Sequence, residues 1–580
     1  MSSPCTGETS EACFHGCCRA PSFVQSPKSP ASSSSTMTTA STSQYHFTMA
    51  ALSSLPNITP YFTNHESLPG LKESFSYFIK AFPHYSQTHR TDQLRSHEYN
   101  HLQTHACLDY IGIGLFSYSQ QQRRRFDPTM ASSSSHTPML SDFYESHFFD
   151  ICYKPLSLKS QMVISRAVLS QEQELEVKLR KRIMAFMNVS EDDYFMVFTS
   201  NQSSAFKLLA DSYPFQTNRN LLTVYDYKSE AVESMVESSK RKGARVNSAE
   251  FSWPHMKLQT KHLKKMLLMR GNKNNKGLFV FPLQSRMTGS RYSYQWMSIA
   301  REDGWHVLLD ACALGPKDME TLGLSLFQPD FLICSFFKVF GENPSGFGCL
   351  FVKKTTCSML EDSTPASTVG IVSLVENPLR KDASLKSKLS EIDDDNDDGE
   401  CRGLDHADSL GLVLISTRAR ILINWLVNAL SRLKHPNSED GHSLIRIYGP
   451  KIGYNRGPSL AFNVFDWKGE KVDPTLVQKL ADRNNISLSC GVLQNFWFDD
   501  KVDEEREMGL EKMSFVVNKC RDNKRERCGI VSVVMASIGL ITNFDDIFRL
   551  WGFVSRFLDA DYVEKERWRY LALNQTTIEV

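Results

Sequence analysis

An excess of charge of either sign is missing from this 580-residue sequence, in which 66 lysines and arginines face 65 aspartates and glutamates. A chain without such an excess has no overall attraction to nucleic acid or to an anionic membrane surface. Long apolar runs are also missing, because the longest nearly uncharged one, at residues 528–541, is too short to cross a bilayer. These absences predict no nucleic-acid partner, no membrane span and a small-molecule ligand.

A secretory signal pattern is missing too, and the 14 cysteines are scattered, so we expect free thiols in a reducing compartment. A cytoplasmic location follows, although residues 26–43, which contain no acidic residue, leave a plastid or another organelle open. One group of N-terminal cysteines has two interpretations, a metal or lipid attachment site or, more simply, an unstructured tail that happens to contain them. The group consists of Cys5, Cys13, Cys17 and Cys18.

Composition divides the chain into four parts. They are a Cys- and Ser/Thr-rich tail (1–60), a large domain with an N-terminal extension and a low-complexity loop near 120–138 (61–360), an acidic insertion (381–403) and a smaller domain (411–570). The block of aspartates in the insertion is typical of a solvated segment rather than of a docking site. We expect the tail and the insertion to be disordered.

Short apolar runs alternate with helical patterns in the large domain, at 195–198, 221–225, 277–281, 306–309, 331–333 and 349–352. Strands without polar alternation are buried on both faces, so these runs predict an α/β fold with a mainly parallel sheet covered by helices. After the acidic insertion the pattern changes to an amphipathic helix at 414–433, strands at 459–465 and 528–539, and a helix capped by Asn543. This pattern predicts a smaller α+β domain.

Several polar residues follow predicted strands, and the ends of parallel strands open at one edge of a sheet. Gln202 and Ser203 begin a helix whose N-terminus is either an anion site or an ordinary cap. Asp310 ends an apolar strand, where a carboxylate needs a partner or caps a loop. Lys338 lies among aromatic residues in Ser335-Phe336-Phe337-Lys338, where desolvation would lower its pKa and favour imine formation with an aldehyde. The alternative for Lys338 is a snorkelling surface lysine.

From about residue 107 to 559 the sequence resembles the aminotransferase class V group, and within it the cysteine-desulfurase-type domain of molybdenum cofactor sulfurases. The resemblance rests on Leu108-Asp109-Tyr110, on Phe198-Thr199 onward, on Phe281-Pro282-Leu283-Gln284-Ser285 followed by Gly289, on Leu309-Asp310-Ala311 and, above all, on Ser335-Phe336-Phe337-Lys338 through Gly341.

The resemblance implies a fold-type-I pyridoxal phosphate transferase with a seven-stranded-type sheet, working as a homodimer on an amino acid, with cysteine as one candidate substrate. It implies that Lys338 carries the cofactor as a Schiff base and that Asp310 pairs with the pyridine nitrogen. The implied cofactor-binding set is completed by Gln202 and Ser203 at the phosphate, Tyr227 against the ring, and Ser335. No metal is implied.

Five residues at positions that take part in the chemistry of the family differ from the family pattern. Tyr227 stands where a histidine is usual, Arg286 where an asparagine is, and Ala313 where desulfurases often have a glutamine. The positions expected for the persulfide cysteine are Val492 and Gln494, and the nearest thiol, Cys490, lies before the glycine instead of after it. The arginine expected to bind a substrate carboxylate is replaced by Met535.

The C-terminal cofactor-binding domain of molybdenum cofactor sulfurases is also expected to be lacking. Three functions therefore stay open. The first is a pyridoxal phosphate enzyme related to cysteine desulfurases, with Cys490 as its candidate thiol. The second is a lyase or aminotransferase acting on another amino acid, with recognition rebuilt around Tyr227, Arg286 and the arginines at 521, 525 and 527. The third is a non-catalytic interaction module.

Overall fold

The computed structural model describes residues 39–56, 60–109, 149–167, 174–268, 277–313, 324, 326–337, 346–360, 370–376, 402–436, 443–497 and 529–576. The predicted low-complexity loop and nearly all of the acidic insertion lie outside these ranges, as do residues 1–38 of the N-terminal tail. The end of that tail was predicted to be disordered, but residues 39–53 form a helix with Ala51 buried, so the prediction is wrong for this part. Residues 44–580 form one compact unit, to which every helix and strand of the described ranges belongs apart from the first residues of helix α1.

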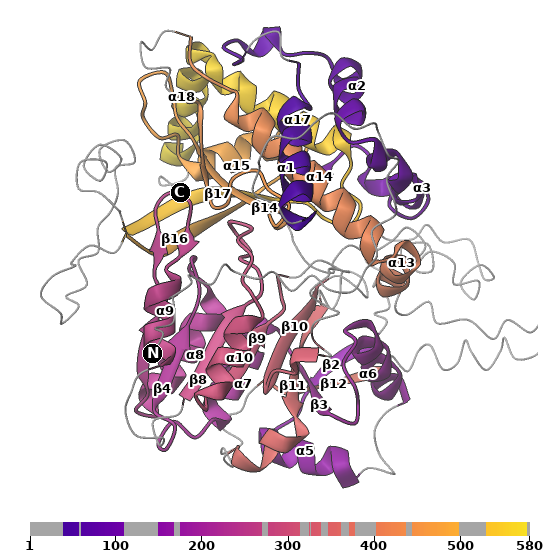
Figure 1. Ribbon diagram of the computed structural model, residues 1–580, viewed down its shortest axis with the longest axis vertical. Coiled ribbons are helices and arrows are strands. Elements are labelled where there is room, and N and C mark those ends of the chain that lie inside the picture. Colours follow the sequence, from indigo (N-terminus) through magenta and orange to yellow (C-terminus); the bar gives the residue numbers. More distant parts are fainter. Residues whose placement is uncertain are drawn as a thin grey trace, which may run out of the picture. The chain divides into compact units, whose positions relative to one another are not determined.

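A seven-stranded sheet forms the larger of two sheets (Figure 1). Strands β10, β9, β8, β4 and β5 are neighbours in this order, and each is parallel to the next. Strand β11 runs antiparallel to both β10 and β3. This arrangement confirms the predicted α/β class and the mainly parallel sheet. The strands, in their order across the sheet, are β3 (Tyr194–Thr199), β11 (Gly346–Lys353), β10 (Phe331–Phe337), β9 (His306–Asp310), β8 (Gly277–Pro282), β4 (Asn220–Thr223) and β5 (Arg245–Ser248).

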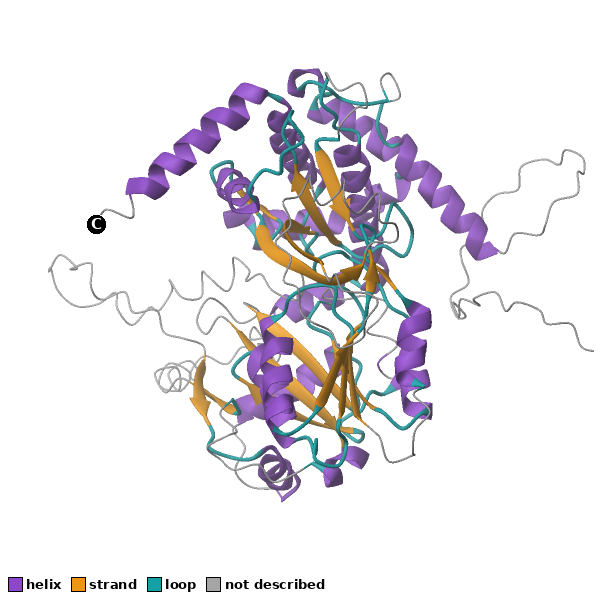
Figure 2. Ribbon diagram, turned by 90° about the vertical axis from the view of Figure 1, so that its left-hand side faces the viewer, coloured by secondary structure: helices purple, strands orange, loops and turns teal. Residues whose placement is uncertain are grey.

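Helices accompany these strands, and Figure 2 shows them on both sides of the sheet. The strands need this cover because their side chains are apolar on both faces; every residue of β8, for example, is buried. The helices of this part are α5 (Leu158–Ala167), α6 (Glu174–Phe186), α7 (Gln202–Ser212), α8 (Glu230–Arg241), α9 (Thr260–Leu267) and α10 (Gln295–Glu302), and a separate two-stranded ribbon pairs β2 (Phe149–Tyr153) with β12 (Val372–Glu376).

A second sheet has six strands in the order β13-β14-β17-β16-β6-β7. Two of its strands, β6 (Phe251–Ser252) and β7 (Lys257–Leu258), come from the middle of the predicted large domain, a crossing that the composition of the chain did not reveal. The others are β13 (Ile445–Tyr448), β14 (Ser459–Val464), β16 (Ser489–Trp497) and β17 (Gly529–Ser537), and nearby β1 (Ala106–Cys107) pairs with β15 (Ile486–Ser487).

Two apolar cores are present, and they do not follow the order of the chain. The first surrounds the seven-stranded sheet. The second joins buried residues of the segment between 51 and 108 to the C-terminal elements. Its helices are α1 (Thr39–Ser53), α2 (Leu71–Ala81), α14 (Leu412–Ser431), α15 (Pro474–Asp482), α17 (Phe544–Ser555) and α18 (Ala560–Thr576). Helices α3 (His89–Glu98) and α13 (Arg402–Leu410) pack their apolar residues against the first core instead.

Helix α14 is the predicted amphipathic helix, and it begins and ends two residues earlier than predicted. Within the described ranges it alone has the length and composition that could span a membrane, yet 61% of its apolar window is buried inside the protein. Trp425 and Leu426 are fully buried in the second core. Asn543 caps α17 as predicted, in a reciprocal capping box with Asp546.

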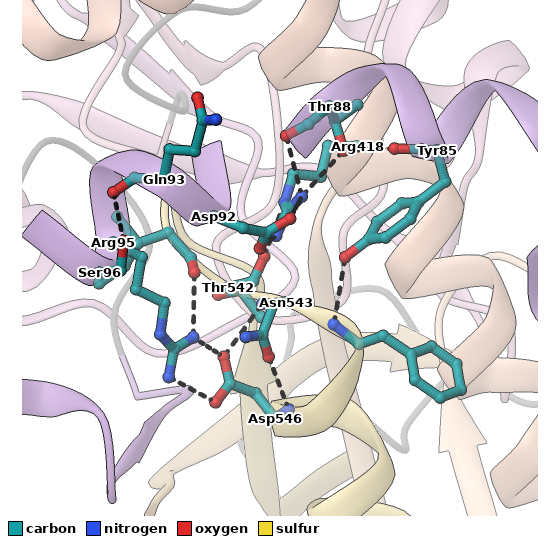
Figure 3. A network of polar contacts seen from close by, with 12 residues as sticks. Tyr85, Thr88, Asp92, Gln93, Arg95, Ser96, Arg418, Thr542, Asn543 and Asp546 are labelled. Carbon is teal, nitrogen blue, oxygen red and sulfur yellow. Dashed lines mark hydrogen bonds and ion pairs between the residues drawn. The ribbon is translucent and has the colours of Figure 1, made fainter. Parts of the chain in front are cut away.

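Ion pairs of two buried arginines hold α3 against α14 and α17 (Figure 3). Arg95 of α3 pairs with Asp546, with 2.9 Å between Nη2 and Oδ1. Arg418 of α14 pairs with Asp92, with 2.5 Å between Nη2 and Oδ1, and its Nη1 donates to Thr88 Oγ1 at 2.8 Å. Each of these two guanidinium groups therefore has its own carboxylate.

Candidate functional site

The carboxyl ends of β4, β8, β9 and β10 lie along one edge of the seven-stranded sheet, because these strands are parallel. Asp310 at the end of β9 stands opposite Pro282 of β8 and Ile333 of β10. The segments that follow these strands therefore meet at this edge. They contain most of the residues that the sequence singled out.

Asp310 is only 2% exposed. Tyr225 Oη donates a hydrogen bond of 2.9 Å to its Oδ2, and the backbone N–H of Cys312 donates one of 3.0 Å to its Oδ1. Burial raises the pKa of Asp310, although these donors and the positive charge of Arg286 oppose the rise. A cationic partner would lower the cost of ionising this carboxyl group.

Tyr227, four residues beyond β4, presents a buried aromatic ring near Asp310. Its ring lies edge-on to that of Tyr225, with the centroids 5.6 Å apart. Burial, followed by the nearby carboxylate of Asp310, raises the pKa of Tyr227 well above the ordinary value, so its phenol is neutral at physiological pH. The backbone of Tyr227 forms an antiparallel bridge with Leu493, which brings β16 of the second sheet to the site.

Asp226, which the sequence patterns did not single out, is completely buried in the same segment. Its Oδ1 accepts a hydrogen bond of 2.7 Å from Ser285 Oγ, and its Oδ2 accepts one of 2.6 Å from Thr288 Oγ1. Burial raises the pKa of Asp226 to about 6, while the two hydroxyl donors oppose the rise. The signal in the sequence was an aspartate directly after an apolar strand, where a carboxylate requires dedicated donors.

The N-cap of α7 is Asn201, the residue directly before Gln202 and Ser203. Asn201 Oδ1 accepts a hydrogen bond of 2.8 Å from the Ser204 N–H, and Ser200 Oγ lies 2.7 Å from Ser204 Oγ. Gln202 and Ser203 form the first turn of α7, and within the described ranges their side chains form no hydrogen bond. This turn has the partial positive charge of a helix N-terminus, which suits an anion.

Lys338 lies outside the described residues. Ser335, three residues earlier, is half-buried in β10 and stands opposite Gly348 of β11, which stands opposite Thr199 of β3. A Cβ on Gly348 would lie 2.7 Å from Thr199 Oγ1 and 2.8 Å from the backbone of Asn201. This close packing brings the end of β10 and the start of α7 to the same edge.

The loops after β8 and β9 are joined by a hydrogen bond of 2.9 Å from Gln284 Nε2 to the backbone oxygen of Ala313. Ala313, expected to be a glutamine in desulfurases, thus contributes its main chain here. Arg286, in the same loop as Gln284, is half-buried, and its positive charge opposes the rise in the pKa of both Asp310 and Tyr227. A fixed cation therefore lies near the two predicted cofactor contacts.

Strand β16 runs beside the segment after β4, with the Lys228 N–H donating to Val492 O at 2.8 Å. Gly491 faces the loop after β8, because a side chain there would collide with Met287. Cys490, the adjacent residue, points to the other face of β16, and its Sγ donates to Pro474 O of α15 at 3.3 Å.

The thiol of Cys490 is not activated in this environment. Partial burial against α15, followed by the carboxylates of Asp473 and Asp482, raises the pKa of Cys490 to about 11. A thiol with this pKa is almost entirely protonated at neutral pH, and the thiolate is the nucleophilic form.

Met535 is buried in β17, opposite Ser489 of β16 and Ala461 of β14. It belongs to the first core together with Met287 and Leu493. The position where the family pattern has an arginine is therefore apolar. Arg521, Arg525 and Arg527, the proposed substitutes, lie outside the described residues.

Comparison with protein families gives a match between residues 163–387 and aminotransferase class-V. This part of the chain is an aminotransferase class-V domain. The domain contains the seven strands of the larger sheet, and with them Asp226, Tyr227, Asp310 and Lys338. Cys490 and Met535 lie beyond it.

Curated relatives extend the similarity. The molybdenum cofactor sulfurase of Solanum lycopersicum is 23% identical over 539 residues, which are 85% of this chain and 60% of that protein. The molybdenum cofactor sulfurase of Neosartorya fischeri is 27% identical over 420 residues, 67% of this chain and 46% of that protein. The chain thus spans about half the length of the curated relatives it matches. It is related to molybdenum cofactor sulfurases.

Among solved structures, a cysteine desulfurase of Escherichia coli superposes with a TM-score of 0.48 at 15% identity, covering 81% of this chain and 98% of that one. A cysteine desulfurase of Thermococcus onnurineus superposes with a TM-score of 0.47, also at 15% identity, covering 82% and 98%.

Proposed function

We propose that this protein binds pyridoxal phosphate at the carboxyl edge of the seven-stranded sheet and acts on a small amino-acid substrate. The observation that carries this proposal is the environment of Asp310, a buried carboxyl group with two hydrogen-bond donors and an aromatic ring nearby. A carboxylate held in this way fits a protonated pyridine nitrogen, because a cation would stabilise the ionised form that burial disfavours.

The other residues at this edge fit the remaining parts of the cofactor. The first turn of α7, with Gln202 and Ser203, suits the phosphate group. Tyr227 offers an aromatic face to the ring, Ser335 lies at the end of the strand that leads to Lys338, and Lys338 is the proposed point of attachment. When bound, pyridoxal phosphate supplies an electron sink for charge that develops at the substrate α-carbon.

Cysteine desulfuration is disfavoured by the surroundings of Cys490. This thiol lies on the face of β16 opposite to Gly491, its pKa is raised to about 11, and it donates to Pro474 O. A desulfurase needs a thiolate that reaches the substrate sulfur. A lyase or aminotransferase acting on another amino acid is therefore the second candidate, and we favour it over sulfur transfer from cysteine.

A non-catalytic interaction module is the remaining alternative. The presence of both Asp310 and Lys338 in the sequence argues against it, because burial disfavours the ionised form of Asp310 and a cationic cofactor would offset that cost. We also expect a homodimer, in line with fold-type-I relatives; light scattering that gives the mass of a single 66.0 kDa chain would contradict this expectation.

The test is the visible absorbance of the purified chain incubated with pyridoxal phosphate. We expect a band near that of a protonated imine in the wild type, no band in Lys338→Ala, and a weakened and blue-shifted band in Asp310→Asn. Absence of this absorbance band in folded wild-type protein would contradict the proposal.

Sulfide release from L-cysteine then separates the two enzyme candidates. We expect release no faster than with free pyridoxal phosphate, and no change in Cys490→Ser. Sulfide release that depends on Cys490 would instead identify a desulfurase.

A further inference from the structure

One buried cation near the site has no acidic partner in the described part of the chain. Arg456, in the loop between β13 and β14, is 2% exposed. Its Nη1 donates to the backbone oxygen of Pro450, its Nη2 donates to Ser459 O at 3.1 Å, and its Nε finds no hydrogen-bond partner in the described ranges. Burial alone lowers the pKa of Arg456 to about 9, and no carboxylate of the described ranges offsets this effect.

Two hydroxyl groups beside this arginine are also unsatisfied. Ser459 and Ser537 stand directly opposite each other in β14 and β17, and both are fully buried. Neither Oγ has a hydrogen-bond partner among the residues described. An unsatisfied buried polar group costs about 1–3 kcal/mol, so three such groups at one place indicate a missing partner.

The missing partner has to accept hydrogen bonds and carry negative charge. An arginine Nε–H has no acceptor capacity, and Nη2 has a second N–H besides the one given to Ser459 O. The Nε and Nη2 edge of a guanidinium forms paired hydrogen bonds with the two oxygens of a carboxylate. The two serine hydroxyls can donate to the same oxygens.

Backbone contacts connect this group to the proposed active site. The Gly457 N–H donates to Gly289 O at 2.8 Å, and a Cβ on Gly457 would lie 2.6 Å from Gln284 Oε1, two residues before Arg286. Gly289 has a φ of 71° and approaches the backbone of Gly457 and Ser459 too closely for a side chain. The arginine is thus held against the loop after β8.

The group also lies next to the apolar position in β17. Ser537 is two residues beyond Met535, so both side chains are on the same face of the sheet. Ser459 and Ala461, opposite them in β14, share that face. Met535 and Ala461 belong to the first core, which surrounds the large sheet.

We propose that Arg456, with Ser459 and Ser537, forms the binding site for the carboxylate of the amino-acid substrate. This inference rests on the proposed function and names the residue that recognises the substrate. The cation that the family pattern has at the Met535 position is supplied here from the neighbouring loop. Arg456 is a binding residue in this account and takes no part in proton transfer.

The experiment measures propionate binding to the full-length chain by calorimetry, in a buffer without phosphate or other carboxylates, with propionamide as the uncharged isostere. We expect propionate to bind, propionamide to bind at least tenfold more weakly, Arg456→Met to reduce propionate affinity at least tenfold, and Arg456→Lys to reduce it less. Ser537→Ala should reduce it severalfold.

Arg432 provides a matched control, because it also donates to backbone oxygens, those of Pro56 and Leu52, and burial lowers its pKa. Arg432→Met should leave propionate affinity unchanged. Equal affinity in the wild type and in folded Arg456→Met, or no propionate binding to the wild type, would overturn the inference and assign the space to water. If Arg456→Met does not fold, Ser537→Ala and the comparison with propionamide decide.

The outcome for the substrate site is distinguishable from the outcome for the cofactor, because calorimetry does not depend on the absorbance band. If the wild type shows no absorbance band with pyridoxal phosphate but binds propionate, and Arg456→Met does not bind it, the result would support the anion site and overturn the proposed function. A band that L-alanine perturbs equally in the wild type and in Arg456→Met would support the cofactor and overturn the carboxylate site.

Discussion

Buried arginines in two regions of this protein differ in what neutralises them. Where α3 meets α14 and α17, Arg95 and Arg418 are each paired with a carboxylate (Figure 3). At the start of β14, Arg456 is as deeply buried, but within the described ranges it contacts only backbone oxygens. The first region completes its own charge balance. The second one leaves a positive charge that a ligand would balance.

This difference separates structural from ligand-binding charge. A buried pair within the chain holds elements in register, and it requires nothing from outside. A buried charge without a counter-charge is costly, and it persists where a bound group repays the cost. Asp310 follows the same logic with the opposite sign, since burial raises its pKa and a cationic ring nitrogen would stabilise it. Substitutions at both kinds of position test this distinction.

The largest effect is expected at Arg95. Arg95→Met leaves the carboxylate of Asp546, whose side chain is 3% exposed, without its cation. Breaking such a pair costs about 3–5 kcal/mol of unfolding free energy. Urea denaturation measures the loss, and Arg95→Met combined with Asp546→Asn should recover part of it. A loss below about 1 kcal/mol would remove the structural half of the comparison.

A smaller effect, dependent on pH, is expected at Asp226. Its pKa rises from 3.8 to about 6 on folding, so its contribution to stability is fully present below pH 4 and is lost as pH rises through about 6. Asp226→Asn removes this loss. The unfolding free energy of the variant, relative to that of the wild type, should therefore rise by roughly 3 kcal/mol between pH 4 and pH 8. Urea midpoints at both pH values test the gain, and an equal difference at the two would contradict it.

Arg456→Met is expected to behave unlike Arg95→Met. The substitution removes the cost of burying a cation without a counter-charge, but it also removes the hydrogen bonds to Pro450 and Ser459. Because these two effects oppose each other, the unfolding free energy should change by less than about 1 kcal/mol at pH 7 in the absence of ligand. The same urea experiment decides. Destabilisation as large as that of Arg95→Met would make Arg456 a structural residue.

The smallest effect is expected at Ser537. Its Oγ has no partner within the described ranges, so Ser537→Ala should change the unfolding free energy by no more than about 0.5 kcal/mol. Ser555→Ala is a control, because Ser555 is equally buried and its Oγ donates to Gly552 O at 2.8 Å. Thermal denaturation compares the two variants. A larger loss for Ser537→Ala than for Ser555→Ala would mean that its hydroxyl is already satisfied.

The sequence predicted those features that depend on local patterns. Uninterrupted apolar runs predicted six of the seven strands of the large sheet but not β5, whose residues are mostly exposed. The strand-end position of Asp310 predicted its place at the carboxyl edge. The capping box of α17 follows from Asn543 and the acidic residues after it. These features depend on neighbours within a few residues, so a single sequence contains enough information to find them.

Features formed by distant segments were not predictable in this way. Arg456 lies in Tyr454-Asn455-Arg456-Gly457, a sequence typical of an exposed loop, and its burial depends on contacts with residues of the loop after β8. The donors of Asp226 lie about 60 residues further along the chain. The strands β6 and β7 join a sheet whose other members begin nearly 200 residues later. Residue patterns do not encode these pairings.

The central claim is that Lys338 holds pyridoxal phosphate at this edge. The most direct measurement is reduction of the purified chain with borohydride in the presence of pyridoxal phosphate, followed by peptide mass spectrometry. We expect one phosphopyridoxyl group, attached to the peptide that contains Lys338, and its loss in Lys338→Arg. Attachment to several surface lysines, or to none, while Lys338 stays unmodified would contradict the account.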